Sequence, residues 1–252
     1  MRLENKIALV TGAAGGIGSA VARRFAREGA TTILSDINRE GAEKVLDVIR
    51  ESGGTGAIVL ADVLKEAEIV ALFERVKKDY GRLDIIANIA GTDVETDASA
   101  DEINYDKMCL NIDVSLKSCI LCCREAAKIM MPQNYGRIVN MSSIVYRGSP
   151  MQFTYSAAKG GVAAFTRSMA MALGMYTITV NALAPSLVEV DIIKNTIGPE
   201  MWEALKQDCA SRYPLGRVGQ PLDVANCALF LASDEASFIT GQIIEISGGA
   251  RL

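Results

Sequence analysis

The chain of 252 residues is 50% hydrophobic and 22% charged, with a formal net charge of −4, and this composition excludes a disordered protein. It contains no histidine, which excludes histidine-dependent hydrolytic triads, imidazole-based metal sites and a histidine general base. Its 26 Lys and Arg and 30 Asp and Glu residues form no block of like charge, so a small-molecule ligand is favoured over nucleic acid or a membrane surface.

Short apolar runs alternate with longer helical patterns along the chain. Seven runs rich in Ile, Val and Leu predict strands at Ile7–Thr11, Thr31–Ser35, Ala57–Val63, Leu83–Asn88, Gly136–Ser142, Ile178–Ala184 and Gln242–Ile246. Apolar residues at helical spacing predict helices at Ile17–Gly29, Arg39–Ser52, Glu66–Tyr80, Tyr105–Met131, Tyr155–Gly174 and Pro221–Ser233. No Pro-, Gly- or Ser-rich linker interrupts this alternation. We therefore expect one doubly wound α/β domain over residues 1–252, with a seven-stranded parallel sheet and helices on both faces.

Other stretches bear on where the protein works. The approach to the first strand, Met1–Lys6, is too short and too charged for a secretory signal, so we expect a cytoplasmic protein. Its six cysteines are then expected to be free thiols, and no metal site is expected. Ser168–Val188 carries no charge over 21 residues, but Gly174 and Pro185 interrupt it. A helix followed by a strand explains this stretch better than a membrane span.

A glycine-rich turn, Thr11–Gly18, lies where the first strand passes into the first helix. Glycines let the backbone approach a pyrophosphate closely, and the helix N-terminus offers unpaired N–H groups to the anion. Asp36 ends the second strand 18 residues after Gly18, near the spacing of the dinucleotide-binding fingerprint. A carboxylate there can accept the hydroxyl groups of the adenosine ribose and repels a 2′-phosphate.

The residues around Asp36 favour NAD over NADP. Neither Ala14 nor Ile37 supplies a cation to neutralise a 2′-phosphate. Arg39 is a nearby cation, so NADP stays as the less favoured alternative. Another interpretation is a glycine-rich turn that only packs, with Asp36 capping the next helix.

Tyr155 and Lys159 can supply the acid–base chemistry that the missing histidine leaves open. They are four residues apart in the helix predicted over Tyr155–Gly174, so they share one face. An ammonium close to a tyrosine favours the phenolate, so we expect Lys159 to lower the pKa of Tyr155 into a range useful for proton transfer. Taken alone, this spacing is also common for surface pairs on helices.

Taken together, the ordered motifs resemble the short-chain dehydrogenase/reductase family from Lys6 to Gly249. The motifs that carry the resemblance are Thr11-Gly12-x-x-x-Gly16-x-Gly18, Asp62-Val63, Asn88-Ile89-Ala90-Gly91, Asn111, Ser142-Ser143, Tyr155-x-x-x-Lys159, Asn181-x-x-x-Pro185 and Gly248-Gly249. The resemblance implies a Rossmann-type fold and an NAD-dependent oxidoreductase that interconverts a secondary alcohol and a ketone. Tyr155 as phenolate would accept the alcohol proton in oxidation, and the phenol would return it in reduction.

The resemblance also implies roles for individual residues. Tyr155 would be the acid/base, Lys159 would lower its pKa and hold the nicotinamide ribose, Ser143 would bind the substrate oxygen, and Asn111 would anchor a water in the proton relay. Asp62 would bind the adenine amino group. The expected cofactor-binding residues are Gly12, Ala14, Gly16, Ile17, Gly18, Asp36, Ile37, Asp62, Val63, Asn88, Ala90, Gly91, Tyr155, Lys159, Pro185 and Val188.

The spacing leaves two candidates for the serine. Ser143 lies 12 residues before Tyr155, one fewer than is commonest in the family, whereas Ser142 lies 13 residues before it. We prefer Ser143, because Asn140–Ser143 matches the strand-end pattern in which the second serine points at the substrate. A deletion in the loop Ile144–Thr154 costs little.

Three loops, Thr92–Ala100, Ile144–Thr154 and Ser186–Ser211, are expected to line the substrate pocket. Their apolar residues either favour a hydrophobic or aromatic alcohol or ketone or merely pack a lid helix; they are Tyr146, Met151, Phe153, Met201 and Trp202. A 3-oxoacyl thioester carried on acyl carrier protein is the alternative substrate. Against it, Met131–Tyr135 lacks cations for docking an acidic carrier.

The helices at Tyr105–Met131 and Tyr155–Gly174 are apolar beyond one face. In similar proteins they pair across a subunit interface, so we expect a homotetramer or homodimer. An alternative of another class is a dinucleotide-binding regulator without turnover. Such relatives typically lose the tyrosine or the lysine, whereas Tyr155 and Lys159 are both present.

Overall fold

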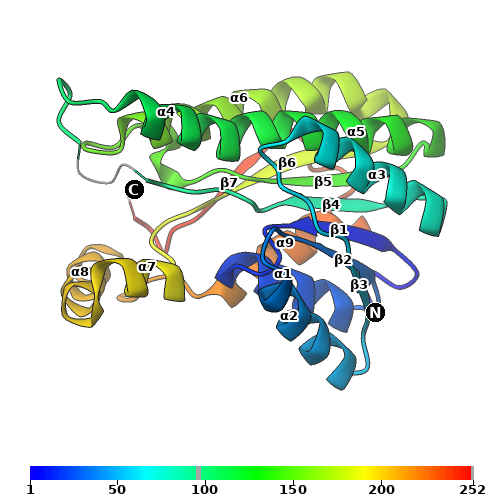
Figure 1. Ribbon diagram of the computed structural model, residues 1–252, viewed down its shortest axis with the longest axis horizontal. Helices are drawn as coiled ribbons and strands as arrows, with labels where there is room; N and C mark the ends of the chain where they lie inside the picture. The colour runs from blue at the N-terminus through cyan, green and yellow to red at the C-terminus, as the bar shows by residue number, and fades with distance from the viewer. Residues whose placement is uncertain (95–97, 251–252) are drawn as a thin grey trace.

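The centre of the structure, a computed structural model that describes residues 1–94 and 98–250, is a parallel β-sheet. Its seven strands follow the order β3-β2-β1-β4-β5-β6-β7. They are β1 (Ile7–Thr11), β2 (Thr31–Ser35), β3 (Thr55–Ile58), β4 (Ile85–Asn88), β5 (Gly136–Met141), β6 (Ile178–Pro185) and β7 (Ile243–Ile246). The predicted α/β class and the predicted seven-stranded parallel sheet are confirmed (Figure 1).

The central strands are buried because helices cover both faces of the sheet. Every residue of β4, β5 and β6 is buried, whereas residues of the edge strands β3 and β7 are partly buried or exposed. In β1, successive side chains alternate between the faces, with Ala8 and Val10 in one core and Leu9 in the other. Burial on both faces explains why these strands read as continuous apolar runs.

Two layers of helices enclose the sheet (Figure 1). One layer consists of α1 (Gly16–Arg27), α2 (Arg39–Glu51) and α9 (Pro221–Ala232). The other consists of α3 (Glu66–Tyr80), α4 (Tyr105–Ile112), α5 (Ser118–Gln133) and α6 (Phe153–Leu173). Each layer packs a separate apolar core against the sheet, with Phe25 in the first and Phe73 in the second.

The strand order reverses its direction between β1 and β4. β2 and β3 extend the sheet on one side of β1, and the chain then returns to add β4 on the other side. Such a reversal separates the connections on the two sides and leaves room for a ligand. The helices α7 (Asp191–Ile197) and α8 (Pro199–Arg212) lie at the carboxyl ends of the strands, at the left of Figure 1.

The third strand is shorter and earlier than the predicted Ala57–Val63. β3 pairs only with β2, from Thr31 with Thr55 to Leu34 with Ile58. Because β2 ends at Ser35, the following residues have little strand left to pair with. The chain therefore leaves the sheet several residues before the apolar run ends.

The helix predicted over Tyr105–Met131 is interrupted by a π-helical turn, η1 (Asp113–Lys117), between α4 and α5. The hydroxyl of Ser118, the first residue of α5, donates to the carbonyl of Val114 in this turn at 2.5 Å. The spacing of hydrophobic residues does not reveal such a turn. π-helical turns are frequent near functional residues. Asn111 lies two residues before its start.

The stretch Ser186–Ser211, expected as a pocket-lining loop, contains most of two helices, α7 and α8. Pro199 starts α8 at a position that suits proline, but only Trp202 and Cys209 are buried in that helix. With so few buried apolar residues, its sequence lacks the amphipathic pattern that identifies a helix.

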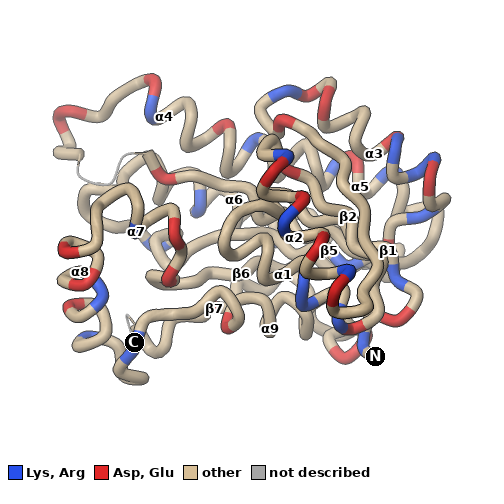
Figure 2. The backbone as a smooth tube through the Cα atoms, turned by 60° about the horizontal axis from the view of Figure 1, so that its bottom comes forward, with Lys and Arg blue, Asp and Glu red and all other residues tan. Residues whose placement is uncertain are grey.

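Acidic and basic residues are interspersed over the backbone, and both α2 and α8 carry the two signs (Figure 2). Many of the charges are paired within one helix, as Lys44 is with Glu40 at 2.7 Å. Across residues 1–94 and 98–250, no helix is both long enough and apolar enough to cross a membrane.

Candidate active site

The glycine-rich turn packs its backbone against the end of β4. Gly12 has a φ of +65°, and a Cβ there would lie 2.9 Å from the Cα of Ala90. A Cβ on Gly18 would lie 2.0 Å from the Gly12 carbonyl oxygen. Glycine is therefore required at both positions by the conformation and closeness of the protein's own backbone.

Helix α1 begins in a way that fits an anion. Gly15 precedes it in an extended conformation, with no capping side chain and no acidic residue in the first turn. Gly15 and Gly16 are exposed, so the N–H groups of the first turn are open to a ligand. This arrangement fits the pyrophosphate of a dinucleotide.

Asp36 lies beside the glycine-rich turn. Its Oδ2 accepts a hydrogen bond from the Ala14 N–H at 2.9 Å, and its Oδ1 accepts one from the Asn38 N–H at 2.9 Å. The two bonds fix the carboxylate next to the anion-binding turn. Arg39 is 68% exposed and lies 3.8 Å from the Glu43 carboxylate, one turn along α2.

Asp62 and Val63 follow the end of β3. The Asp62 carboxylate accepts a hydrogen bond from the Leu64 N–H at 2.9 Å and lies 3.4 Å from the Lys65 ammonium. The Asp62 carboxylate is thus held by its own turn on the same side of the sheet as Asp36.

A buried threonine shapes the turn after β4. The Thr11 hydroxyl accepts hydrogen bonds from the N–H groups of Ile89 and Ala90, at 3.1 and 3.3 Å. Thr11 is almost fully buried, so it holds the Ile89–Gly91 turn against the end of β1. The sequence motif contained Thr11, but no role had been expected for it.

Asn88 anchors a buried polar cluster behind that turn. Its Nδ2 donates to Asn140 Oδ1 at 2.9 Å and to Cys123 Sγ at 3.3 Å. Asn140 in turn donates to the Thr166 hydroxyl at 3.0 Å. These bonds join β4, β5, α5 and α6, and no motif marked Cys123 or Thr166 as part of the site. Asn88 Oδ1 has no hydrogen-bond partner among the described residues.

Ser143 and Tyr155 lie together. Ser143 follows β5 and Tyr155 lies in the first turn of α6, and the two side chains are close enough for the Ser143 hydroxyl to lower the pKa of Tyr155. The adjacent Ser142 is buried, and its hydroxyl donates to the Lys159 carbonyl at 3.0 Å. Of the two serines, therefore, Ser143 faces the tyrosine and Ser142 holds the helix.

Lys159 is buried beside Tyr155. Its Nζ donates to the Met141 carbonyl at 2.9 Å and lies 5.4 Å from the centre of the Tyr155 ring. A Cβ on Gly91 would lie 3.0 Å from the same Nζ, so the turn after β4 covers the ammonium closely. Burial lowers the pKa of Lys159 to about 8, although the charges of Cys119 and Asp93 act in the opposite direction.

The expected lowering of the Tyr155 pKa by Lys159 is not found in this structure. Burial raises the pKa of Tyr155, the negative charge of Asp93 raises it further, and the hydrogen bond with Ser143 lowers it. The Lys159 ammonium donates to the Met141 carbonyl and lies over the ring. Tyr155 is therefore held as the phenol, the form that donates a proton.

Asn111 connects two segments of the site. Its Nδ2 donates to the Thr154 hydroxyl at 2.9 Å, and its Oδ1 accepts from the Val94 N–H at 3.1 Å. The fully buried side chain thus ties the segment after β4 to the start of α6. The expected water-anchoring role of Asn111 remains a prediction.

The segment after β6 passes over the glycine-rich turn. Pro185 ends β6, and its carbonyl lies 3.5 Å from the Ser143 hydroxyl, which donates to it. Val188 is buried and bridges to Gly219. A Cβ on Gly16 would lie 2.7 Å from a methyl group of Val190. The start of the lid, which is the segment after β6 that leads into α7 and α8, therefore lies between the anion-binding turn and the Ser143–Tyr155 pair.

The residues expected to line the substrate pocket have different environments. Trp202 is fully buried in α8, so it packs within the lid. Met151 and Met201 are exposed, and the Tyr146 hydroxyl donates to the Glu245 carboxylate at 3.1 Å. A hollow of about 550 Å³ lies where α7 meets α8, lined by Ile197, Gly198, Pro199, Glu200, Met201 and Ala204.

With this geometry established, comparisons with known proteins identify the family. The sequence model described as Enoyl-(Acyl carrier protein) reductase matches residues 12–251. The chain is 38% identical over 250 residues to the 3-oxoacyl-(acyl-carrier-protein) reductase FabG of Thermotoga maritima, covering 99% of both proteins. Levodione reductase has a similar structure, with a TM-score of 0.94, 30% identity and 98% of both chains covered.

A second solved structure is a 7α-hydroxysteroid dehydrogenase complexed with NADH and 7-oxo glycochenodeoxycholic acid. Its TM-score is 0.92 at 32% identity, with 99% of this chain and 95% of that chain covered. The chain therefore belongs to the short-chain dehydrogenase/reductase family, which confirms the resemblance seen in the sequence. It is an NAD(P)-dependent oxidoreductase of the class that reduces carbonyl groups and oxidises alcohols.

Proposed function

We propose that this protein is an NAD-dependent oxidoreductase that interconverts a secondary alcohol and a ketone, with Tyr155 as the general acid/base. The observation that carries the proposal is that Tyr155 lies close to Ser143, with the buried Lys159 ammonium 5.4 Å from the centre of the Tyr155 ring. These groups lie at the same edge of the sheet as the anion-binding turn and Asp36. This edge is where open parallel sheets bind their ligands.

In this proposal each polar side chain has a separate task. The Ser143 and Tyr155 hydroxyls bind the carbonyl oxygen, and Tyr155 donates its proton as negative charge develops there. Bound NADH supplies the hydride to the carbonyl carbon. Lys159 binds the nicotinamide ribose, and its ammonium stabilises the phenolate that remains when Tyr155 has donated its proton, while Asn111 holds the start of α6 and anchors a water in the relay.

The residues around the glycine-rich turn bind the cofactor in this proposal. Asp36 accepts hydrogen bonds from the adenosine ribose and repels a 2′-phosphate, which favours NAD over NADP. Asp62 binds the adenine amino group. The cleft is completed by Gly12, Ala14, Gly16, Ile17, Gly18, Ile37, Val63, Asn88, Ala90, Gly91, Pro185 and Val188.

For the substrate, we propose a hydrophobic or aromatic alcohol or ketone. Exposed apolar side chains of the segments near the site, Met151 and Met201, support this class. A 3-oxoacyl thioester on acyl carrier protein is the second candidate, favoured by the 38% identity to FabG. A carrier-linked substrate requires docking of an acidic protein, so activity that is equal on a free thioester analogue and on the carrier-bound form would count against it.

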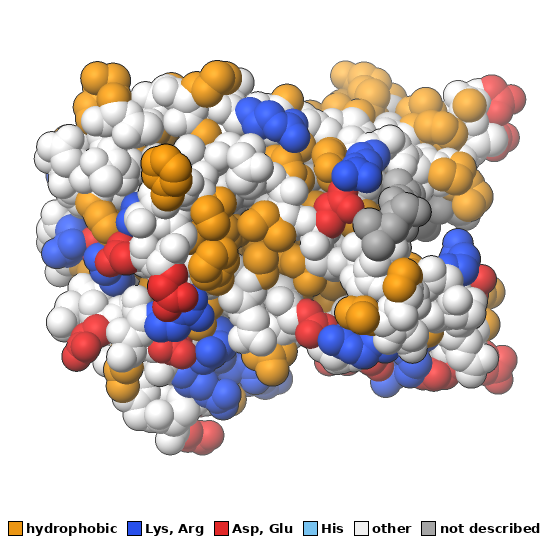
Figure 3. Space-filling view, turned by 180° about the vertical axis from the view of Figure 1, so that it is seen from behind, with side chains coloured by type: hydrophobic (Ala, Val, Ile, Leu, Met, Phe, Trp, Pro, Cys, Tyr) orange, Lys and Arg blue, Asp and Glu red, His pale blue; other side chains and the backbone are white. Residues whose placement is uncertain are grey.

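We also propose that the chain works in the cytoplasm as a homotetramer or homodimer. Met171, near the end of α6, and Met175, in the turn after it, are each 80% exposed, and Phe238 is fully exposed. Figure 3 shows apolar side chains gathered on the rear face of the molecule. Light scattering tests this proposal, since a lone species near the chain mass of 26.9 kDa would contradict self-association.

The decisive experiment follows NADH absorbance with purified protein and a panel of secondary alcohols and ketones. We expect turnover that Ser143→Ala lowers by about 10²–10³-fold in kcat, as loss of one donor to a developing oxyanion does. Ser142→Ala is the matched control, because its hydroxyl faces the Lys159 carbonyl. NADH binding without turnover of any substrate would instead indicate the non-catalytic dinucleotide-binding regulator.

A further inference from the structure

A carboxylate, Asp93, lies close to the reacting groups and has no task in the proton transfer described above. It follows Gly91 by two residues, and a Cβ on Gly91 would lie 3.0 Å from Lys159 Nζ. Burial has the larger influence on Tyr155 and Lys159, but the Asp93 charge raises the pKa of both. Asp93 is therefore within electrostatic reach of the acid/base and its lysine.

Bonds from two sides position Asp93. Gln152, three residues before Tyr155, donates its Nε2 to Asp93 Oδ2 at 2.6 Å. On the other side of Asp93, the Val94 N–H donates to the buried Asn111 side chain at 3.1 Å. The segment that carries the carboxylate is thus attached both to the start of α6 and to the end of α4.

Asp93 is also open to a ligand. Its side chain is partly exposed, as are those of Ser143 and Tyr155. An ionised carboxylate only accepts hydrogen bonds, at about four acceptor positions, and a substrate donor would reach Asp93 from its exposed side. The same charge disfavours a second anion in the cleft.

We propose that Asp93 determines substrate specificity by accepting a hydrogen bond from a hydroxyl on the carbon next to the substrate carbonyl, and by repelling a carboxylate at that position. The preferred substrates are then α-hydroxy ketones and the corresponding vicinal diols. This inference rests on the proposed function, because it requires the carbonyl oxygen to bind between Ser143 and Tyr155.

Three aryl ketones that differ at this one carbon test the inference: 2-hydroxyacetophenone, propiophenone and phenylglyoxylate. For the wild-type protein with NADH, we expect kcat/KM to fall at least about tenfold from the hydroxy ketone to propiophenone, and again to phenylglyoxylate. Asp93→Asn removes the charge but keeps an acceptor, so it should mainly relieve the rejection of phenylglyoxylate. Asp93→Ala removes both the charge and the acceptor. It should lower the ratio of kcat/KM for the hydroxy ketone to kcat/KM for phenylglyoxylate at least about tenfold.

Asp101→Asn is the matched control. Asp101 is an exposed carboxylate farther along the same segment, where it accepts a hydrogen bond from the Ser99 hydroxyl at 2.8 Å. NADH binding and the melting temperature of each variant show whether it is folded. The inference is overturned if the ratio of kcat/KM for the hydroxy ketone to kcat/KM for phenylglyoxylate in Asp93→Ala stays within twofold of the wild-type ratio. It is also overturned if Asp101→Asn changes this ratio as much as Asp93→Ala does. Turnover of ketones without this preference contradicts only the inference, whereas no turnover of any carbonyl compound contradicts the proposed function itself.

Discussion

Tyr135 and Tyr155 each have a lysine ammonium over the ring, but they lie at opposite edges of the sheet. At the amino edge, Lys6 Nζ is 3.9 Å from the centre of the Tyr135 ring, and the Tyr135 hydroxyl donates to Asp234 at 2.9 Å. At the carboxyl edge, Lys159 Nζ is 5.4 Å from the centre of the Tyr155 ring. A tyrosine–lysine pair alone therefore does not identify a catalytic site. The group beside the tyrosine hydroxyl differs between the two pairs, since it is the Asp234 carboxylate at Tyr135 and Ser143 at Tyr155.

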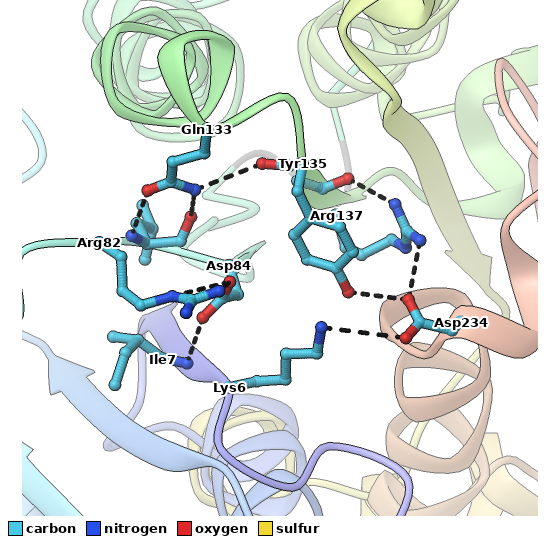
Figure 4. A network of polar contacts seen from close by, with 10 residues as sticks. Lys6, Ile7, Arg82, Asp84, Gln133, Tyr135, Arg137 and Asp234 are labelled. Atoms are coloured by element: carbon cyan, nitrogen blue, oxygen red, sulfur yellow. Dashed lines mark hydrogen bonds and ion pairs between the residues drawn. The ribbon is translucent and has the colours of Figure 1, made fainter.

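The amino edge is a closed network of ion pairs and hydrogen bonds (Figure 4). The buried Arg137 guanidinium lies 2.9 Å from the Asp234 carboxylate. Asp84 is fully buried, accepts the Ile7 N–H at 2.8 Å and pairs with Arg82. The charged groups of this network pair with one another, although Arg137 Nε has no hydrogen-bond partner among the described residues, so this edge stabilises the fold. At the carboxyl edge, Asp36, Ser143 and Tyr155 are partly exposed.

The largest difference between the two edges should come from replacing each tyrosine by phenylalanine. Tyr155→Phe removes the proposed acid/base and should lower kcat by about 10²–10⁴-fold with little loss of stability. Tyr135→Phe removes one hydrogen bond to an exposed carboxylate and should cost about 1 kcal/mol of unfolding free energy with kcat preserved. Steady-state kinetics and urea unfolding of both variants measure the two effects. Equal loss of activity in the two variants would show that the edges do not differ in this way.

A second way to separate the edges is Arg137→Met. The change removes a buried guanidinium that pairs with Asp234 and donates to the carbonyl groups of Gly136 and Thr177, at 3.0 and 3.3 Å. We expect the unfolding free energy to fall by about 3 kcal/mol, measured by urea denaturation. Activity per folded molecule should stay near the wild-type value. A variant as stable as the wild type would mean that this network contributes little.

The elements that were predicted well from the sequence are those marked by residue patterns within or directly beside them. β1, β2 and α3 have the predicted bounds, because continuous apolar runs mark the two strands, helical spacing marks α3, and flanking glycines mark their ends. The glycine-rich turn and Asp36 meet as expected, because parallel strands bring their carboxyl ends together. Spacing alone could not choose between Ser142 and Ser143, since the direction of each hydroxyl depends on how the chain leaves β5.

Contacts between distant segments could not be predicted from the sequence. Gln152 and Asp93 are 59 residues apart, and neither belongs to a recognisable motif, so their bond could be found only in the folded chain. The raised pKa of Tyr155 could not be predicted from the sequence either. The spacing of Tyr155 and Lys159 predicted a shared helical face, but burial of both groups and the Met141 carbonyl decide their charges.

The buried ammonium of Lys159 should make stability depend on pH. Its pKa in the folded protein is about 8, below the ordinary value, since burial disfavours the charge despite the nearby Cys119 and Asp93. Above pH 8 the unfolded chain therefore binds more protons than the folded one, and this group's contribution to unfolding free energy rises until the ordinary pKa is reached. From about pH 7 to about pH 9.5, wild type should gain about 2 kcal/mol relative to Lys159→Met. Urea titrations of both proteins measure this effect. If the difference in unfolding free energy between wild type and Lys159→Met is the same at both pH values, a buried ammonium is contradicted.

The smallest expected effect compares two carboxylates that hold a backbone N–H in the same way. Asp36 accepts from Ala14 and Asp84 accepts from Ile7, at 2.9 and 2.8 Å, but Asp36 is partly exposed beside the anion-binding turn, whereas Asp84 is buried in the closed network. Asp36→Asn removes the charge that repels a 2′-phosphate, so the affinity for NADPH relative to NADH should rise about tenfold, or about 1.4 kcal/mol. Asp84→Asn should lower stability and leave that ratio unchanged, as fluorescence titration with both cofactors would show. If Asp36→Asn also leaves the ratio unchanged, cofactor choice lies elsewhere, and Arg39 is then the residue to replace.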